Sequence, residues 1–118
     1  MFNNASGFDK IYIASGFTDL RRGIDGLTPI IQQGFQLDPF QNVLFLFCGK
    51  RTDRIKALLW EGDSFVLLYK RLEAGKFQWL RTEIEAKSIT PTQFRLLMEG
   101  LAIDQPKAVQ KVYPRKAL

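Results

Sequence analysis

The sequence has no histidine and a single cysteine among its 118 residues. Without histidine there is no imidazole general base, no nucleophile activated by histidine and no metal site with histidine ligands. The lone Cys48 excludes an intrachain disulfide. It ends an apolar run, so we expect it to be a small buried hydrophobic residue. These absences remove several common kinds of catalytic and metal site.

Long apolar runs are also missing. No stretch approaches the roughly 18 apolar residues that indicate a membrane-spanning helix. The first ten residues, MFNNASGFDK, lack the basic segment and apolar core of a secretory signal peptide. The expectation from these absences is a cytoplasmic protein without a membrane anchor.

The composition present is that of one globular domain. Hydrophobic residues make up 46% of the chain and aromatic residues 13%, which is enough for a core. The net charge is +5 and the isoelectric point about 9.6. A basic domain of this size can bind a nucleic acid or another anionic partner. The alternative is a soluble protein that is basic without such a partner.

The first half of the chain predicts two strands around a helix. Residues 10–14 alternate in polarity and predict a short strand. Thr18 or Asp19 can cap a helix that runs to about Gln33, and its apolar stripe recurs at helical spacing. That stripe consists of Leu20, Ile24, Leu27 and Ile31. After a turn region at 35–42, the apolar run 43–48 predicts a strand buried on both faces.

The second half predicts a hairpin, a further strand and a helix. Two strand-like runs in residues 54–71 flank Gly62-Asp63, a strong hairpin signal. A turn at 73–76 leads into FQWL, 77–80, which we expect to continue an antiparallel meander. Residues 90–100 begin with the capping-box pattern Thr-Pro-Thr-Gln and end at a glycine, as helices do.

The fold class predicted from these elements is α+β. We expect a single domain with an antiparallel β-meander of about five strands and two main helices, over residues 1–104. Residues 105–118 are expected to form a basic, flexible tail.

The stretch CGKRTDRIK, 48–56, raises the question of phosphate binding, since Gly49-Lys50 resembles the end of a phosphate-binding loop. That loop needs a second glycine five positions earlier, a Ser or Thr after the lysine, and a following helix. Here Leu44 and Arg51 occupy those positions, and a strand follows. We therefore do not predict a nucleotide cradle of this type.

The hairpin gives a more specific prediction. With a turn at Gly62-Asp63, one face pairs Arg54 with Arg71, Lys56 with Tyr69, Leu58 with Leu67 and Trp60 with Phe65. Directly opposed arginines repel each other, and an anion between them would relieve the repulsion. The basic turn residues Lys50 and Arg51 lie nearby.

The basic cluster is also compatible with two roles that involve no DNA. The side chains can extend into water, with Asp53 and Glu73 partly neutralising them and the stem of Lys56 packed on Tyr69. They can also contact the acidic face of a protein partner.

The carboxylates offer another chemistry. Asp19, Asp25, Asp53, Glu61 and Asp63 could bind Mg²⁺ for phosphoryl transfer. Each of them also suits a cap, a turn or a polar helix face, and no pair with a third carboxylate is convincingly placed. We therefore predict no metal site, no catalytic residue and no cofactor.

Three segments resemble a known family. TDLRRGIDGL (18–27), DPF (38–40) and KRTDRIKALLWEGDSFVLLYKRLEAGKFQW (50–79) are similar to the small accessory protein of the insertion-sequence-66 family of bacterial transposons, labelled TnpB or Orf2-like. The resemblance covers residues 10–100. Leu80 departs from the family's usual proline, and Cys48-Gly49 from more polar residues.

The resemblance implies a non-enzymatic role in DNA transposition. A separate, larger transposase supplies the strand-transfer carboxylates in this family, so none is assigned to this chain. The label TnpB is shared with an unrelated RNA-guided nuclease, whose activity does not carry over. Arg21 and Arg22 lie within the matched segments and join the basic residues as exposed candidates.

The function predicted from the sequence is that of an accessory protein that binds DNA, the transposase or both. DNA would be held by phosphate contacts, and an apolar sheet face or the last helix would dock the transposase or a second copy of the chain. The alternatives are a pure protein-interaction module and a small metal-dependent nuclease. The candidate nucleic-acid-binding residues are Arg21, Arg22, Lys50, Arg51, Arg54, Lys56, Tyr69, Lys70 and Arg71.

Overall fold

The computed structural model describes residue 5 and residues 7–103. The expected basic tail, 105–118, lies outside these residues. In chain order the elements are β1 (Lys10–Ala14), α1 (Ile24–Pro29), the π-helical turn η1 (Ile30–Gly34), β2 (Val43–Cys48), β3 (Arg54–Trp60), β4 (Phe65–Arg71), β5 (Ala86–Ile89) and α2 (Pro91–Met98). The α+β class predicted from the sequence is confirmed.

The five strands form one mixed sheet in the order β4-β3-β2-β1-β5. Strands β2, β3 and β4 are the antiparallel meander that the sequence predicts. The sheet is not antiparallel throughout, however, because β1 pairs with β2 in parallel. The helical segment between those two strands makes the crossover that parallel pairing requires. Strand β5 then pairs antiparallel with the other edge of β1.

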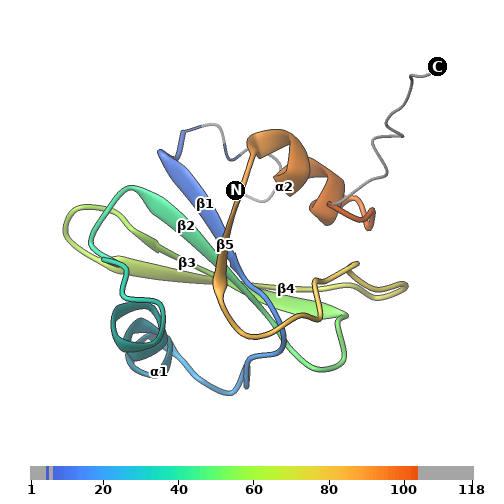
Figure 1. Cartoon of the computed structure of the whole chain (residues 1–118), viewed down its shortest axis with the longest axis horizontal. Helices are drawn as coiled ribbons and strands as arrows, with labels where there is room; N and C mark the ends of the chain where they lie inside the picture. The colour runs from blue at the N-terminus through green and yellow to red at the C-terminus, as the bar shows by residue number, and fades with distance from the viewer. Residues whose placement is uncertain (1–4, 6, 104–118) are drawn as a thin grey trace.

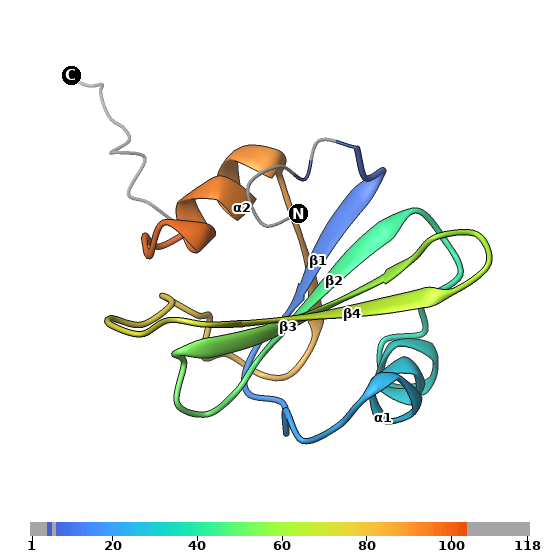
Figure 2. The same cartoon turned by 180° about the vertical axis from the view of Figure 1, so that it is seen from behind.

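Helices cover both faces of the sheet (Figures 1 and 2). On one face α1 and η1 bury Leu27 and Ile31 against Phe45, Phe47 and Leu58. On the other face, α2 buries Phe94 and Leu97 against a core that includes Phe77 and Trp79. Strand β2 is buried at every position, as its apolar run predicts, and Cys48 is fully buried.

The first helix begins later than the sequence predicts. Its N-cap is Gly23, not Thr18 or Asp19. The carboxylate of Asp19 instead accepts hydrogen bonds from the backbone N–H and the guanidinium of Arg21, so it does not cap the helix. The stripe prediction still holds for packing, because Leu20 and Ile24 contact the same core as Leu27 and Ile31.

The expected strand at 77–80 is wrong. Phe77 and Trp79 are both buried, so the alternation is real, but within the described residues this segment pairs with no strand. Single backbone hydrogen bonds hold its ends, from Phe77 to the carbonyl of Thr52 and from Gly16 to the carbonyl of Leu80. The fifth strand is β5 instead.

The second helix confirms its predicted start. Thr90 is the N-cap, Pro91 follows it, and the side chains of Thr90 and Gln93 each accept the other residue's backbone N–H. The helical part ends before Gly100, which has a φ of 81°. None of the helices in the described part of the chain is long and apolar enough to cross a membrane.

Candidate nucleic-acid interface

An open pocket of about 810 Å³ lies where the β2–β3 turn, strands β3 and β4, and the segment before α1 meet. We call it the basic groove. Five cationic side chains and one carboxylate line it, together with apolar and aromatic residues. The cations are Arg21, Lys50, Arg51, Arg54 and Lys56, and the carboxylate is Asp19. Such an excess of positive charge creates a local potential that attracts anions.

Backbone contacts bring the two loops of the groove together. The N–H of Thr18 donates a 2.9 Å hydrogen bond to the carbonyl of Cys48, at the end of β2. A side chain at Gly49 would meet the Leu20 side chain, since its Cβ would lie 3.3 Å from Leu20 Cδ1. Glycine at this position therefore lets the segment before α1 approach the β2–β3 turn closely.

The predicted register of the β3–β4 hairpin is confirmed. Arg54 pairs with Arg71, Lys56 with Tyr69, Leu58 with Leu67 and Trp60 with Phe65. Leu58, Phe65 and Leu67 contact the core under α1, so these pairs share the α1 face of the sheet. Alternate residues, including Ile55, Ala57 and Leu68, pack on the α2 side.

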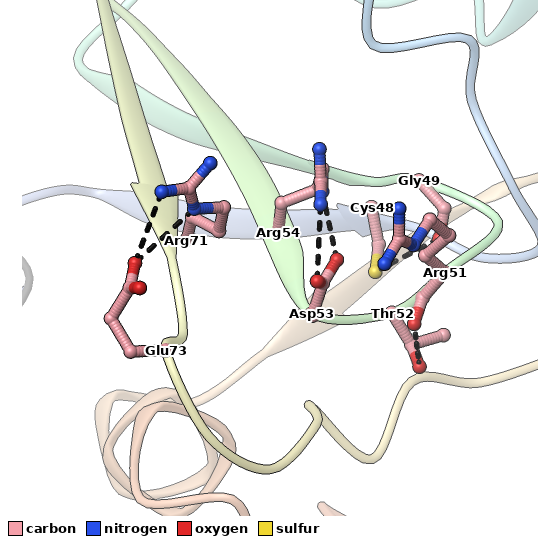
Figure 3. A network of polar contacts seen from close by, with 8 residues as sticks. All are labelled: Cys48, Gly49, Arg51, Thr52, Asp53, Arg54, Arg71 and Glu73. Atoms are coloured by element: carbon pink, nitrogen blue, oxygen red, sulfur yellow. Dashed lines mark hydrogen bonds and ion pairs between the residues drawn. The ribbon is translucent and has the colours of Figure 1, made fainter.

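The two opposed arginines are each paired with a carboxylate of the same molecule (Figure 3). Arg54 Nε lies 2.8 Å from Asp53 Oδ1, and Arg71 Nη2 lies 3.2 Å from Glu73 Oε2. The hydrogen bonds with Arg54 lower the pKa of Asp53. Asp53 and Glu73 therefore neutralise the two arginines, as one of the alternatives from the sequence predicts. No anion is required between Arg54 and Arg71.

Arg21 is paired in the same way. Its guanidinium and backbone N–H donate to the Asp19 carboxylate, with Nη2 2.8 Å from Oδ2. These hydrogen bonds lower the pKa of Asp19 to about 2. The Arg21 side chain is nevertheless 91% exposed, so its outer edge faces solvent at the rim of the basic groove.

Three cations of the basic groove are not held by a carboxylate. Within residue 5 and residues 7–103, Lys50 and Arg51 are exposed and make no ion pair or side-chain hydrogen bond. Lys56 Nζ donates a 2.9 Å hydrogen bond to the backbone carbonyl of Arg22. Lys50, Arg51 and Lys56 are thus the cations of the groove whose charge is least compensated.

Six of the nine candidate residues line the basic groove, and three do not. Arg22 lies beside it and contributes its backbone carbonyl to Lys56. Arg71 projects from the end of β4 towards Glu73. Lys70 pairs with Ile55 and so lies on the α2 side of the hairpin, away from the groove. The sequence did not identify the apolar lining residues Phe17, Leu20 and Leu67.

The carboxylates that the sequence offers as possible Mg²⁺ ligands do not form a cluster in the described residues. In the described ranges, no three His, Cys, Asp or Glu residues gather in a group able to hold a metal ion. Asp19 and Asp53 each pair with an arginine, and the Asp63 carboxylate accepts a hydrogen bond from Ser64.

Comparison with known proteins agrees with the resemblance seen in the sequence. Residues 9–108 match the family described as IS66 Orf2 like protein. Two uncharacterized proteins of Sinorhizobium fredii are similar: y4jC is 35% identical over 78% of this chain and 79% of its own length, and y4hO is 33% identical over 83% and 85%. No solved structure matches. The chain therefore belongs to the IS66 Orf2-like family, the small accessory proteins associated with transposition of insertion sequences.

Proposed function

We propose that this protein is a non-catalytic accessory factor that binds DNA phosphates through the basic groove during transposition. The observation that carries the proposal is the convergence of Arg21, Lys50, Arg51, Arg54 and Lys56 on one groove with a single lining carboxylate. These cations come from two segments of the chain, one before α1 and one that runs from the β2–β3 turn into β3. Phosphate contacts from such a surface give affinity and position a protein on DNA without reading its sequence.

The existing ion pairs are compatible with this role. Arg54 and Arg21 are held by Asp53 and Asp19 at the edge of the groove, so their guanidinium groups are pre-positioned. A guanidinium has five N–H donors, and one carboxylate uses only part of them. The remaining donors can form charge-assisted hydrogen bonds to a phosphate.

We further propose that the transposase of the same element is the protein partner. The broad apolar sheet faces suggested by the sequence are buried by α1 and α2, so they do not offer a docking surface. Apolar exposure remains at the hairpin tip, where Phe40 is 48% exposed and packs on Trp60 and Phe65. This aromatic cluster is separate from the basic groove, so protein and DNA can bind together.

The DNA-binding proposal is tested by fluorescence anisotropy with labelled DNA from the ends of the element. The double variant Lys50→Gln, Arg51→Gln removes two groove charges. The control, Lys10→Gln, Lys76→Gln, removes the same charge from exposed positions that do not line the groove. We expect the groove variant to bind DNA about tenfold more weakly or worse. The slope of its log K against log salt should also become shallower, by the amount that corresponds to roughly two lost phosphate contacts. The control variant should have a much smaller effect on both quantities.

Equal losses in the two double variants, or no binding by the wild type at about 0.1 M salt, would overturn the DNA-binding proposal. A stable complex with the transposase in the second case would favour the protein-interaction alternative. The nuclease alternative predicts Mg²⁺-dependent nicking that disappears in Asp53→Asn or Asp63→Asn, and we expect no such activity.

A further inference from the structure

The basic groove is lined by apolar and aromatic side chains as well as by cations. The apolar and aromatic lining consists of Phe17, Leu20, Leu67 and Tyr69. Tyr69 is 51% exposed, although it follows four half-buried apolar residues on the same strand. Contact with phosphates alone would leave this apolar surface in water.

A DNA duplex does not fit this combination well. Its outer surface presents phosphates and sugars, while the faces of its bases are stacked inside. Single-stranded DNA exposes base faces beside the phosphates. Proteins that bind it combine a positively charged groove with aromatic side chains on which the bases stack.

We propose that the basic groove binds single-stranded DNA, with a base stacked on Tyr69 and the adjoining phosphates on Lys50, Arg51 and Arg54. This inference rests on the proposed function and specifies the form of DNA that the groove accepts. Leu20 and Leu67, which also line the groove, cover the rest of the base.

Tyr69 is placed for this role by its neighbours. It pairs across the hairpin with Lys56, whose ammonium group is tied to the carbonyl of Arg22. Tyr69 also lies close to Arg54: the ion pair with Asp53 is the main cause of the raised pKa of Arg54, and the Tyr69 phenol contributes to it. A base on the Tyr69 ring would therefore have a guanidinium beside it to hold the adjoining phosphate.

The groove lies next to an edge of the sheet, because Tyr69 lines it and belongs to an edge strand. β4, which carries Tyr69, is the edge strand of the sheet, and no other strand of the described chain lies beyond it. The volume of about 810 Å³ lies within the range of small-ligand sites, roughly 300–1,000 Å³. There is room for a nucleotide in the groove while the chain of DNA continues past the edge.

Three labelled probes separate the contributions of bases and phosphates in an anisotropy experiment on the full chain. They are an oligothymidylate of about 12 nucleotides, an abasic oligomer of the same length and a duplex of about 12 base pairs. We expect the oligothymidylate to bind about tenfold tighter than either of the other probes at matched salt.

A second measurement uses variants of the exposed aromatic residue. Tyr69→Ala is expected to weaken oligothymidylate binding about tenfold or more, with little effect on the abasic oligomer, whereas Tyr69→Phe keeps the wild-type affinity. Leu101→Ala, at an apolar residue of similar exposure outside the groove, serves as the control. Circular dichroism melts confirm that each variant is folded.

The outcomes test the single-strand inference separately from the proposed function, which is phosphate binding by the basic groove. Equal affinity for all three probes, lost in Lys50→Gln, Arg51→Gln but unchanged in Tyr69→Ala, would overturn the single-strand assignment and leave phosphate binding in place. Tighter binding of the duplex would do the same. No binding of any probe would overturn both.

Discussion

Lys56 Nζ donates a hydrogen bond of 2.9 Å to the backbone carbonyl of Arg22, 34 residues earlier in the chain. The contact joins β3 to the segment before α1, and these are two of the walls of the basic groove. A cation selected only for DNA contact would not need such a bond. Lys56 therefore has two roles: it holds the groove in shape and adds to its charge.

The variant Lys56→Met, compared with Lys10→Met, separates these roles from the effect of lowering the net charge of the protein by one. It keeps the apolar stem and removes the hydrogen-bond donor, so we expect the free energy of unfolding to fall by about 1 kcal/mol or less. DNA affinity should fall more than in Lys10→Met, which removes the same charge outside the groove. Urea denaturation followed by tryptophan fluorescence, with anisotropy for DNA, checks both. An affinity equal to that of Lys10→Met would contradict both roles of Lys56 in the groove.

A second prediction concerns Trp79 in the segment 77–80, because this side chain is buried and hydrogen-bonded to another part of the chain. Its indole N–H donates a 2.9 Å hydrogen bond to the carbonyl of Ala14 at the end of β1, and the side chain is 6% exposed. Trp79→Phe removes the donor and some volume, so we expect a loss of about 1–3 kcal/mol in the free energy of unfolding.

Urea denaturation followed by circular dichroism checks this value, because the substitution also changes the fluorescence signal. Gln78→Ala, at the exposed neighbour, is the control and should leave stability almost unchanged. A Trp79→Phe variant as stable as the wild type would show that the indole hydrogen bond contributes nothing.

Local features of the fold could be predicted from the sequence, and long-range pairings could not. The register of β3 and β4 follows from one turn at Gly62-Asp63, because a tight turn fixes which residues face each other. The capping box of Thr90 and Gln93 is equally local. In contrast, β5 pairs with β1 across more than 70 residues, and its four residues carry little strand signal.

The errors have physical causes in particular residues. The sequence predicts a helix capped by Thr18 or Asp19, but Arg21 satisfies the Asp19 carboxylate and the helix starts at Ile24 instead. The alternation of Phe77 and Trp79 correctly indicates an extended segment with one buried side. Alternation does not show whether another strand is free to pair with it.

The candidate site was predictable only where it lies on the hairpin and the turn before it. Lys50, Arg51, Arg54, Lys56 and Tyr69 fall close together because the hairpin register is local. The placement of Arg21, Leu20 and Phe17 follows the backbone contact between Thr18 and Cys48, and the missing side chain at Gly49 leaves room for Leu20. A single sequence gives no sign of that contact.

The buried thiol of Cys48 yields a prediction about pH. Burial raises its pKa from the usual 9.0 to about 12, so the thiol stays protonated and unreactive in the folded protein. We expect no alkylation by iodoacetamide at about pH 8, and complete reaction in denaturant. Mass spectrometry measures the modified fraction. Rapid alkylation without denaturant would contradict the burial of this residue.

The same shift predicts a loss of stability at high pH. The folded pKa lies above the unfolded value, so the stabilisation is present below about pH 9 and is lost as the pH rises towards about 12. Urea denaturation across this range, compared with Cys48→Ala, isolates the contribution of the thiol, since the lysines and tyrosines titrate in both proteins.

The Asp53–Arg54 ion pair provides the sharpest test of the basic groove. Asp53→Asn keeps the size of the side chain but removes the charge that holds the Arg54 guanidinium. If Arg54 contacts phosphate with the N–H donors that Asp53 leaves unused, the negative charge of Asp53 beside it repels that phosphate. The variant should therefore bind DNA roughly threefold to tenfold tighter, with the gain largest at low salt.

Glu73→Gln is the matched control, because it makes the same change of charge beside Arg71, which does not line the groove. Anisotropy titrations at several salt concentrations compare the two variants. A gain confined to Asp53→Asn places the phosphate at Arg54. An equal gain in both variants would mean that only the net charge of the protein matters, and the groove would then have no special role in binding DNA.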